Sequence, residues 1–358
     1  MNDTSIPPAP RANPNFVGHP AAEQTLLRAW QSNRLHHAWL ISGPRGVGKA
    51  TLAFRFARHA LAGEEQGLFV EPASTLTMAP ESPVFRHVAG GSHPDLLTIE
   101  RGYDEKRDRF RTAIVVDDVR QLGAFLHLKA AAGGWRVVVV DCADDLNLNA
   151  ANALLKLLEE PPAKALLLLV SHAPGRLLPT IRSRCRRLTL GPLDAQIMDE
   201  VLAASCPKLD DADRRLLIQL AEGSSGRALE IAGSGGLDLY RDIAGQLGQL
   251  PKLDAVALHA LGDRLGHKDA GDRFRLATEI LLGWLGRAVR SAATGQGAPD
   301  SIGGEGALAL PLGRHSLEQW LELWEKTASL FARVESANLD RKQVWVGAML
   351  DIAGLASR

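Results

Sequence analysis

A glycine-rich stretch that contains one lysine, GPRGVGKAT from Gly43 to Thr51, has the residue types and spacing of a phosphate-binding loop. It follows the apolar run AWLIS and begins a helical pattern, which is the context that such a loop requires. Its glycines let backbone N–H groups approach phosphate oxygens with no Cβ in the way, and Lys49 would reach the β- and γ-phosphates. The alternative is a glycine-rich turn with a surface lysine. The candidate nucleotide-binding residues of this loop are Gly43, Gly46, Val47, Gly48, Lys49, Ala50 and Thr51.

The loop departs from the usual pattern directly after its lysine. Ala50 occupies the position where a Ser or Thr normally ligates Mg²⁺. Thr51 comes one residue later, and its side chain would point about 100° further round the helix. Nucleotide binding tolerates this change better than metal-assisted hydrolysis does.

A second candidate site is the acidic end of the run RVVVVDC. Four valines lead to Asp141, whose carboxylate could organise Mg²⁺ directly or through water. The next residue is Cys142, and a thiol is a poor substitute for a carboxylate base that orients water. An Asp that bonds only to turn amides is the structural alternative. The nearby Asp144 and Asp145 have the spacing of a loop or a helix N-cap.

Positive charge is concentrated between Arg176 and Arg187, where five arginines occur with no acidic residue. Arginine suits bidentate contact with phosphate, and it can stabilise charge at the γ-phosphate of a neighbouring subunit. A solvated basic surface is the alternative. Arg227, in GSSGRAL, is a weaker candidate, because the same residues could form a turn and an exposed helix start.

Short apolar runs alternate with helical patterns in the first half of the chain. This alternation predicts a parallel, doubly wound α/β sheet of five strands. The expected strands are 38–42, 95–99, 137–140, 166–170 and 186–190, and the expected helices between them are 49–62, 117–131 and 149–159. After residue 191 the pattern is helical, with expected helices at 194–204, 210–222, 254–265, 271–294, 315–335 and 340–356 and a glycine-rich linker at 295–306.

Composition excludes several classes of protein. The 41 Lys and Arg residues balance 41 Asp and Glu residues, so a generally basic nucleic-acid binder is disfavoured. Aromatic residues make up 5%, which disfavours stacking platforms for single strands. Three scattered cysteines and the lack of a long apolar run indicate a reduced, cytoplasmic location with no membrane contact.

Assembled, these motifs resemble the clamp-loader group of the AAA+ ATPases, and most closely the delta-prime type of subunit in bacterial DNA polymerase III. The likeness covers about residues 14–231. The segments that carry it are FVGHP at 16–20, HHAWLISGPRGVGKATLA at 36–53, GSHPDLLTI at 91–99, and NAANALLKLLEEPPAKALLLLVSHAPGRLLPTIRSRC at 149–185.

This resemblance implies an AAA+ nucleotide-binding domain, a small helical lid and an all-α collar. The expected boundaries are a flexible arm at 1–13, the AAA+ domain at 14–191, the lid at 192–249 and the collar at 250–358. It also implies that Asp141 is the family's acidic strand end, that Ser171 lies in the first sensor region, that Arg184 is an arginine finger acting in trans, and that Arg227 lies at the second sensor.

The departures at Ala50 and Cys142, with Arg184 retained, suit a stator that hydrolyses ATP weakly or not at all. The implied partners are the delta and gamma/tau subunits of a hetero-pentamer, with the sliding clamp and primed DNA met through the complex. ATP or ADP, with Mg²⁺, are the expected ligands. Zinc is not expected, because the excursion at 63–93, where relatives often carry a four-cysteine module, has no cysteine.

Two other functions remain open from the sequence. An ATP-hydrolysing AAA+ motor, of the gamma/tau or helicase-loader type, is disfavoured by Ala50 and Cys142. A sequence-independent DNA-binding module would act through the arginines of 176–187 and would lose affinity steeply with salt.

Overall fold

The computed structural model describes residues 8–32, 34–63, 74–104, 109–128, 130, 134–294, 317–334 and 337–357. These residues form two compact units: the first comprises Met1–Ser205 with Ala221–Arg227, and the second comprises Cys206–Leu220 with Ala228–Arg358. The prediction of three domains therefore stays a prediction. The expected linker at 295–306 lies outside the described residues, as does part of the 63–93 excursion.

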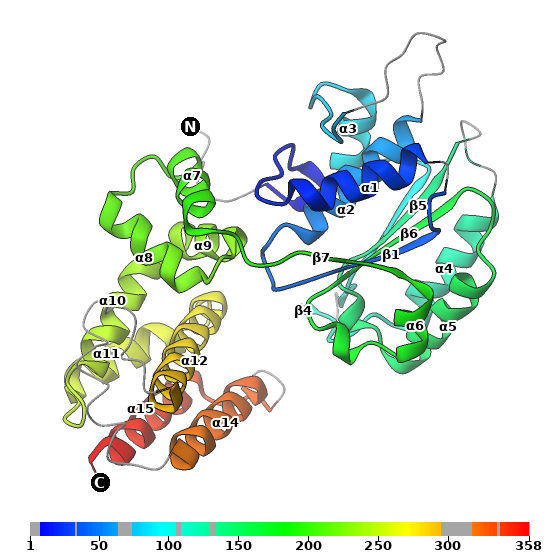
Figure 1. Cartoon of the computed structure of the whole chain (residues 1–358). Coiled ribbons are helices and arrows are strands. Elements are labelled where there is room, and N and C mark those ends of the chain that lie inside the picture. The colour runs from blue at the N-terminus through cyan, green and yellow to red at the C-terminus, as the bar shows by residue number, and fades with distance from the viewer. Residues whose placement is uncertain are drawn as a thin grey trace. The chain divides into compact units, whose positions relative to one another are not determined.

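The first unit is built on a five-stranded parallel sheet in the order β2-β5-β6-β1-β7, with a separate antiparallel pair, β3 and β4 (Figure 1). This confirms the predicted fold class. The strands are β1 (Ala38–Ser42), β2 (Leu96–Ile99), β3 (Tyr103–Asp104), β4 (Arg109–Phe110), β5 (Arg136–Val140), β6 (Ala165–Ser171) and β7 (Arg186–Thr189).

Helices cover both faces of this sheet, which is why its central strands β1, β5 and β6 are buried along their whole length, whereas the edge strand β7 exposes three of its four residues. Successive residues of a strand point to opposite faces, so Trp39 and Ile41 of β1 join one core cluster while Ala38 and Leu40 join the other. The helices of this unit are α1 (Pro20–Gln31), α2 (Lys49–Ala62), α3 (Pro83–Ala89), α4 (Val116–His127), α5 (Leu148–Glu159), α6 (Pro179–Arg184) and α7 (Ala195–Ser205), with 3-10 turns η1 (Pro10–Ala12), η2 (Ala143–Asp145) and η3 (Pro174–Arg176).

The described part of the second unit is helical. An aromatic core joins its later helices, because Phe331 contacts both Phe274 and the fully buried Trp345. Its helices, two of which begin or end in the first unit, are α8 (Asp211–Ala221), α9 (Ser225–Gly233), α10 (Gly236–Leu247), α11 (Ala255–Gly266), α12 (Gly271–Thr294), α14 (Leu317–Arg333) and α15 (Arg341–Ser357). None of the described helices is long and apolar enough to cross a membrane.

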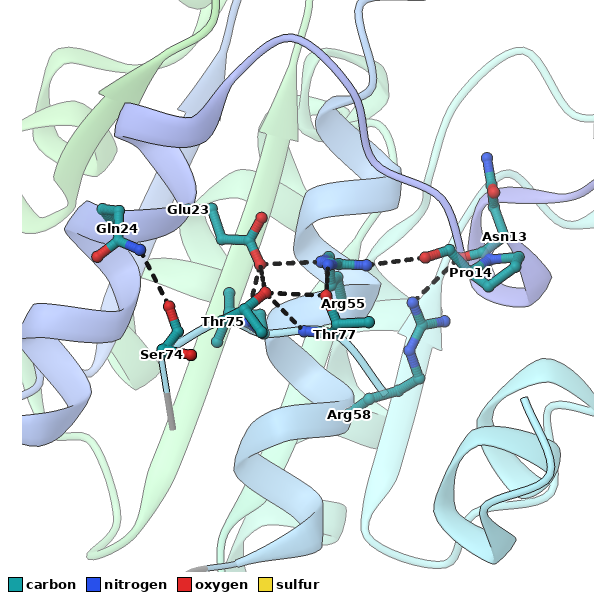
Figure 2. Close-up of polar contacts among 10 residues, drawn as sticks. Asn13, Pro14, Glu23, Gln24, Arg55, Arg58, Ser74, Thr75 and Thr77 are labelled. Atoms are coloured by element: carbon teal, nitrogen blue, oxygen red, sulfur yellow. Dashed lines mark hydrogen bonds and ion pairs between the residues drawn. The ribbon is translucent and has the colours of Figure 1, made fainter. Parts of the chain in front are cut away.

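The N-terminal arm is held against the phosphate-loop helix α2 where the structure describes it. Arg58 is 1% exposed and donates to the carbonyl oxygens of Arg11 and Asn13, each at 3.0 Å. The neighbouring Arg55 donates to Pro14 O at 2.8 Å (Figure 2). Buried guanidinium groups need such acceptors, so these contacts fix the path of the chain into α1.

Candidate functional site

The loop between β1 and α2 has the backbone that its glycines predict. Gly43, Gly46 and Gly48 all adopt positive φ angles, of 146°, 78° and 94°. Two of these glycines also have no room for a side chain. A Cβ on Gly43 would lie 2.1 Å from Leu190 O, and a Cβ on Gly46 would lie 2.2 Å from Ser224 Oγ. A side chain at either position would therefore disturb the loop.

Lys49, the first residue of α2, turns back into the loop. Its ammonium donates to Gly43 O at 2.8 Å and also to Pro44 O, and the residue is only 3% exposed. Burial lowers the pKa of Lys49 to about 8, against the opposing field of Cys142, Asp141 and Asp144. The Lys49 ammonium, which was expected to bind phosphate oxygens, is thus bonded to carbonyl oxygens of the loop itself.

The residue directly after Lys49 has no side-chain oxygen that could ligate Mg²⁺, although this is the position where a phosphate loop normally has a Ser or Thr. Ala50 packs its methyl group against the core beneath α1 and α2, and Thr51, one residue further, is buried. Elsewhere in the described part of the chain, no group of three or more His, Cys, Asp or Glu side chains is arranged to hold a metal ion. The residues at 49–51 therefore fit a nucleotide better than they fit its magnesium ion.

Asp141 follows β5 directly, as predicted. Burial and the nearby carboxylates of Glu100 and Asp145 raise the pKa of Asp141, while Lys49 opposes the shift. The adjacent Cys142 is 8% exposed, and its thiol donates to Asp144 Oδ2 at 2.7 Å. Burial, followed by that hydrogen bond, raises the pKa of Cys142 to about 12. The residue after Asp141, where a carboxylate base would orient water, is therefore a neutral thiol.

Asp144 has a role that the sequence did not reveal. It lies in η2, and the N-cap of the following helix α5 is Asn147 instead. Besides the Cys142 thiol, its carboxylate accepts from Ser171 Oγ at 2.7 Å and from the amides of His172 and Ala173 at 2.5 and 3.2 Å. Burial alone would raise the pKa of Asp144, but these four hydrogen bonds together lower it.

This carboxylate ties the ends of two neighbouring strands together. Ser171 is the last residue of β6 and is fully buried, so its hydroxyl is already used by Asp144. The signal that could have found the contact is the pairing of β5 with β6, in which Val140 lies beside Leu169 and both strand ends meet at one edge. Asp144 is saturated with donors and is therefore a structural group rather than a free base.

The GSSGR segment, residues 223–227, belongs to the first compact unit and packs directly on the phosphate loop. The amide of Gly226 donates to Gly46 O at 2.9 Å, and Ser225 Oγ donates to the same oxygen at 3.4 Å. The amide of Arg227 donates to Ser224 Oγ at 3.1 Å, while the buried Nε of Arg227 makes no hydrogen bond. The structure thus brings the predicted residues Gly46 and Arg227 to the same place.

The N-terminal segment covers the other side of the loop. The Phe16 ring would lie 3.2 Å from a Cβ on Gly48, and the ring nitrogen Nε2 of His19 lies 3.2 Å from Val47 O. Burial lowers the pKa of His19, so the neutral ring is favoured at neutral pH. The loop is enclosed by chain segments that come from both sides of it in the sequence.

Arg184 takes part in different contacts. It is the last residue of α6, where Nη2 lies 2.7 Å from Glu159 Oε1 and Nη1 donates to Thr180 O at 3.1 Å. Its side chain is 36% exposed, and both partners belong to α5 and α6 rather than to the phosphate loop. The predicted site residues therefore separate into a cluster around Lys49 and one exposed arginine.

Comparison with known proteins connects this geometry to a family. Residues 18–194 match the family described as "DNA polymerase III, delta subunit". The chain is 39% identical over 199 residues to the DNA polymerase III subunit delta' of Pseudomonas aeruginosa, covering 56% of each chain. Residues 18–194 place the chain in the clamp-loader family, as a delta-prime-like member.

Two further relatives extend the comparison. The delta-prime-like chain is 34% identical over 210 residues to subunit delta' of Escherichia coli, covering 58% of each chain. It is 30% identical over 262 residues to subunit tau of Salmonella typhimurium, covering 70% of this chain and 38% of that one. The alignments thus span little more than half the length of the two delta' relatives.

Proposed function

We propose that this chain is a stator subunit of the DNA polymerase III clamp loader. In that role it helps the ATP-dependent loading of the sliding clamp onto primed DNA, within a hetero-pentamer with delta and gamma/tau subunits in the cytoplasm. A helical lid at 192–249 and a collar at 250–358 complete the proposed subunit. Its own phosphate loop serves mainly to hold the fold, and nucleotide binds there weakly or without turnover.

The contacts of Lys49 support this proposal most directly. Its ammonium bonds two carbonyls of the loop, where a nucleotide-binding lysine would face the phosphates. Any phosphate must compete with these acceptors and with the burial that lowers the pKa of Lys49 to about 8. Bound nucleotide would be held by the loop amides of 43–51 and by Lys49, with Arg227 close by at Gly46.

The acidic strand end argues against hydrolysis at this site. A base that activates water must be near the water and free to accept its proton. The Cys142 thiol has a pKa of about 12 and donates to Asp144, which already accepts four hydrogen bonds. The chain therefore offers no such base beside Lys49 among these residues.

The exposed position of Arg184 supports action on a neighbouring subunit. Besides the carbonyl oxygen of Thr180, its guanidinium bonds only to Glu159, in an ion pair whose side chains are 36% and 50% exposed, so a stronger anion can displace Glu159 at small cost. In the proposed complex that anion is the γ-phosphate held by the adjacent subunit. Glu159 then acts as a resting partner that keeps the arginine oriented.

The test is Arg184→Ala in a reconstituted loader, with the exposed Arg187→Ala as the matched control. The proposal requires DNA-stimulated ATP turnover at the adjacent subunit's site to fall about 1000-fold or more when the finger is removed, and to change little in the control. Assembly is checked by size-exclusion chromatography. Unchanged turnover with an intact complex removes the finger role, and strong Mg²⁺-dependent hydrolysis by the isolated chain favours the motor alternative.

A further inference from the structure

A surface hollow of about 410 Å³ lies between helix α1 and the edge strand β7, both in the first compact unit. Three residues on about one turn of α1, its C-cap residue and a single residue of β7 line it: Thr25, Arg28, Ala29, Ser32 and Arg186. None of these residues belongs to the phosphate loop, and none pairs with Arg184. The hollow is therefore separate from the site described above.

The hollow has strong positive charge with no built-in counter-charge. Its lining contains two arginines and no acidic residue. Among the described residues neither Arg28 nor Arg186 has an ion-pair partner, unlike Arg55, for example, which pairs with Glu23. Two unpaired guanidinium groups on facing elements repel each other, and a shared anion relieves that repulsion.

Arg186 is also held in position. Its guanidinium carbon lies 4.9 Å from the centroid of the Trp39 ring, and Trp39 is fully buried in β1, the neighbouring strand. This cation–π contact orients the planar group before any ligand arrives. An arginine fixed in this way loses less side-chain entropy on binding than a free surface arginine does.

The lining chemistry selects the kind of anion. Besides the guanidinium groups its polar side-chain atoms are the hydroxyls of Thr25 and Ser32, which already donate to the carbonyl oxygens of Ala21 and Ala29, and the rest of the lining is aliphatic. A nucleobase would need an exposed aromatic ring for stacking, but the lining has none, and the Trp39 ring beside Arg186 is buried. A carboxylate is satisfied by one guanidinium fork, whereas a phosphate presents oxygens toward both arginines.

We propose that this hollow is a phosphate-binding site in which Arg28 and Arg186 hold one phosphate group from two sides. That group is either a free phosphate or a phosphodiester of a DNA backbone, which share this chemistry. The site stands independently of the proposed stator role, because it uses neither Arg184 nor the phosphate loop.

The experiment uses the full chain and the variants Arg28→Gln, Arg186→Gln and the double variant, with Arg86→Gln on α3 as a control that removes one exposed positive charge. One arm titrates sodium phosphate by calorimetry at constant ionic strength. The other arm measures binding of a short DNA duplex by fluorescence anisotropy over a range of salt concentrations. Arg186→Lys, which keeps a cation near Trp39, and a thermal melt of each variant separate loss of binding from loss of folding.

We expect the two glutamine substitutions to weaken phosphate binding, and Arg86→Gln to leave it unchanged. If the ligand is a DNA backbone, each substitution also makes the negative slope of log K against log salt concentration less steep by about 1. Arginine-dependent binding of phosphate alone supports the site with free phosphate as its ligand, and arginine-dependent binding of DNA supports it with the backbone. If the double variant of Arg28→Gln and Arg186→Gln is folded and binds both phosphate and DNA as tightly as the Arg86→Gln control does, the proposal is overturned.

Discussion

The hydroxyl of Ser171 donates to Asp144 Oδ1 at 2.7 Å, across a gap of 27 residues in the sequence. The same carboxylate bonds the amides of the two residues that follow Ser171 and the thiol of Cys142. One side chain in η2 thus fixes the loop that leaves β6. Asp144 thereby joins the end of β6 to the segment that follows β5, and its carboxylate, which accepts four hydrogen bonds, is not available for chemistry.

Replacing Asp144 with Ala should destabilise the first unit strongly. The change leaves the buried Ser171 hydroxyl and two amides without their acceptor, and each hydrogen bond to a charged group is worth about 1.5–3 kcal/mol. We expect a loss of about 2–4 kcal/mol in urea unfolding. Asp145→Ala is the control, because its ion pair with Arg101 is partly exposed and should be worth less than about 1 kcal/mol. Equal losses in the two variants would contradict the role given to Asp144.

The same carboxylate should contribute to acid sensitivity. Its pKa is lowered in the folded protein, so its contribution to stability is complete above the pKa of the unfolded chain, about 3.9. That contribution is lost as the pH falls through the lower, folded value. The difference in unfolding free energy between wild type and Asp144→Asn should therefore shrink at acid pH, and a pH-independent difference would count against this assignment.

Gly46→Ala tests the contact between the phosphate loop and the GSSGR segment. The substitution forces a side chain into φ = 78° and toward Ser224 Oγ, at 2.2 Å. Gly235→Ala is a matched control, because Gly235 has a similar φ of 68° in the left-handed helical region and open space around its Cβ position. The control should cost about 1–2 kcal/mol from backbone strain alone, and Gly46→Ala should cost clearly more. A second substitution, Ser224→Gly, should recover part of that excess.

Elements that depend on local sequence signals were predicted correctly, whereas contacts between residues distant in the sequence were not. Strand β1 and helix α2 begin and end where the apolar run and the glycine loop indicated, because burial of a whole strand and a Gly-to-Lys helix start are local signals. Helix α10, at 236–247, was missed because four glycines among residues 233–245 hide its apolar face. The role of Asp144 was missed because it depends on which strands are neighbours, which one sequence does not state.

Lys49 should give the protein an alkaline signature. Its folded pKa of about 8 lies below the unfolded value of about 10.5, so the unfolded chain binds more protons between these two pH values. Stability from this group therefore rises as the pH increases from about 8 to 10.5. The difference in unfolding free energy between wild type and Lys49→Met, measured at several pH values, isolates this contribution from other groups that titrate there. A difference that stays constant over the range would show that Lys49 is not desolvated.

Glu23→Ala should separate the arginine network of Figure 2 from ordinary surface pairs. Glu23 Oε1 accepts from Arg55 Nε at 3.1 Å, from Thr75 Oγ1 at 3.0 Å and from the amide of Leu76 at 2.7 Å. The side chains of Arg55 and Glu23 are 6% and 13% exposed, so removing the carboxylate leaves a buried positive charge. The expected cost is about 3–5 kcal/mol.

The matched control for Glu23→Ala is Asp117→Ala, which breaks an exposed pair with Arg120 and should cost less than about 1 kcal/mol. Glu23→Gln keeps an oxygen for Thr75 and Leu76 but removes the charge opposite Arg55, so it should fall between the two. This order identifies the buried charge as the main contribution, because the neutral isostere restores the hydrogen bonds and not the ion pair. If Glu23→Gln is as stable as wild type, the hydrogen bonds alone hold the 74–77 segment to α1 and α2.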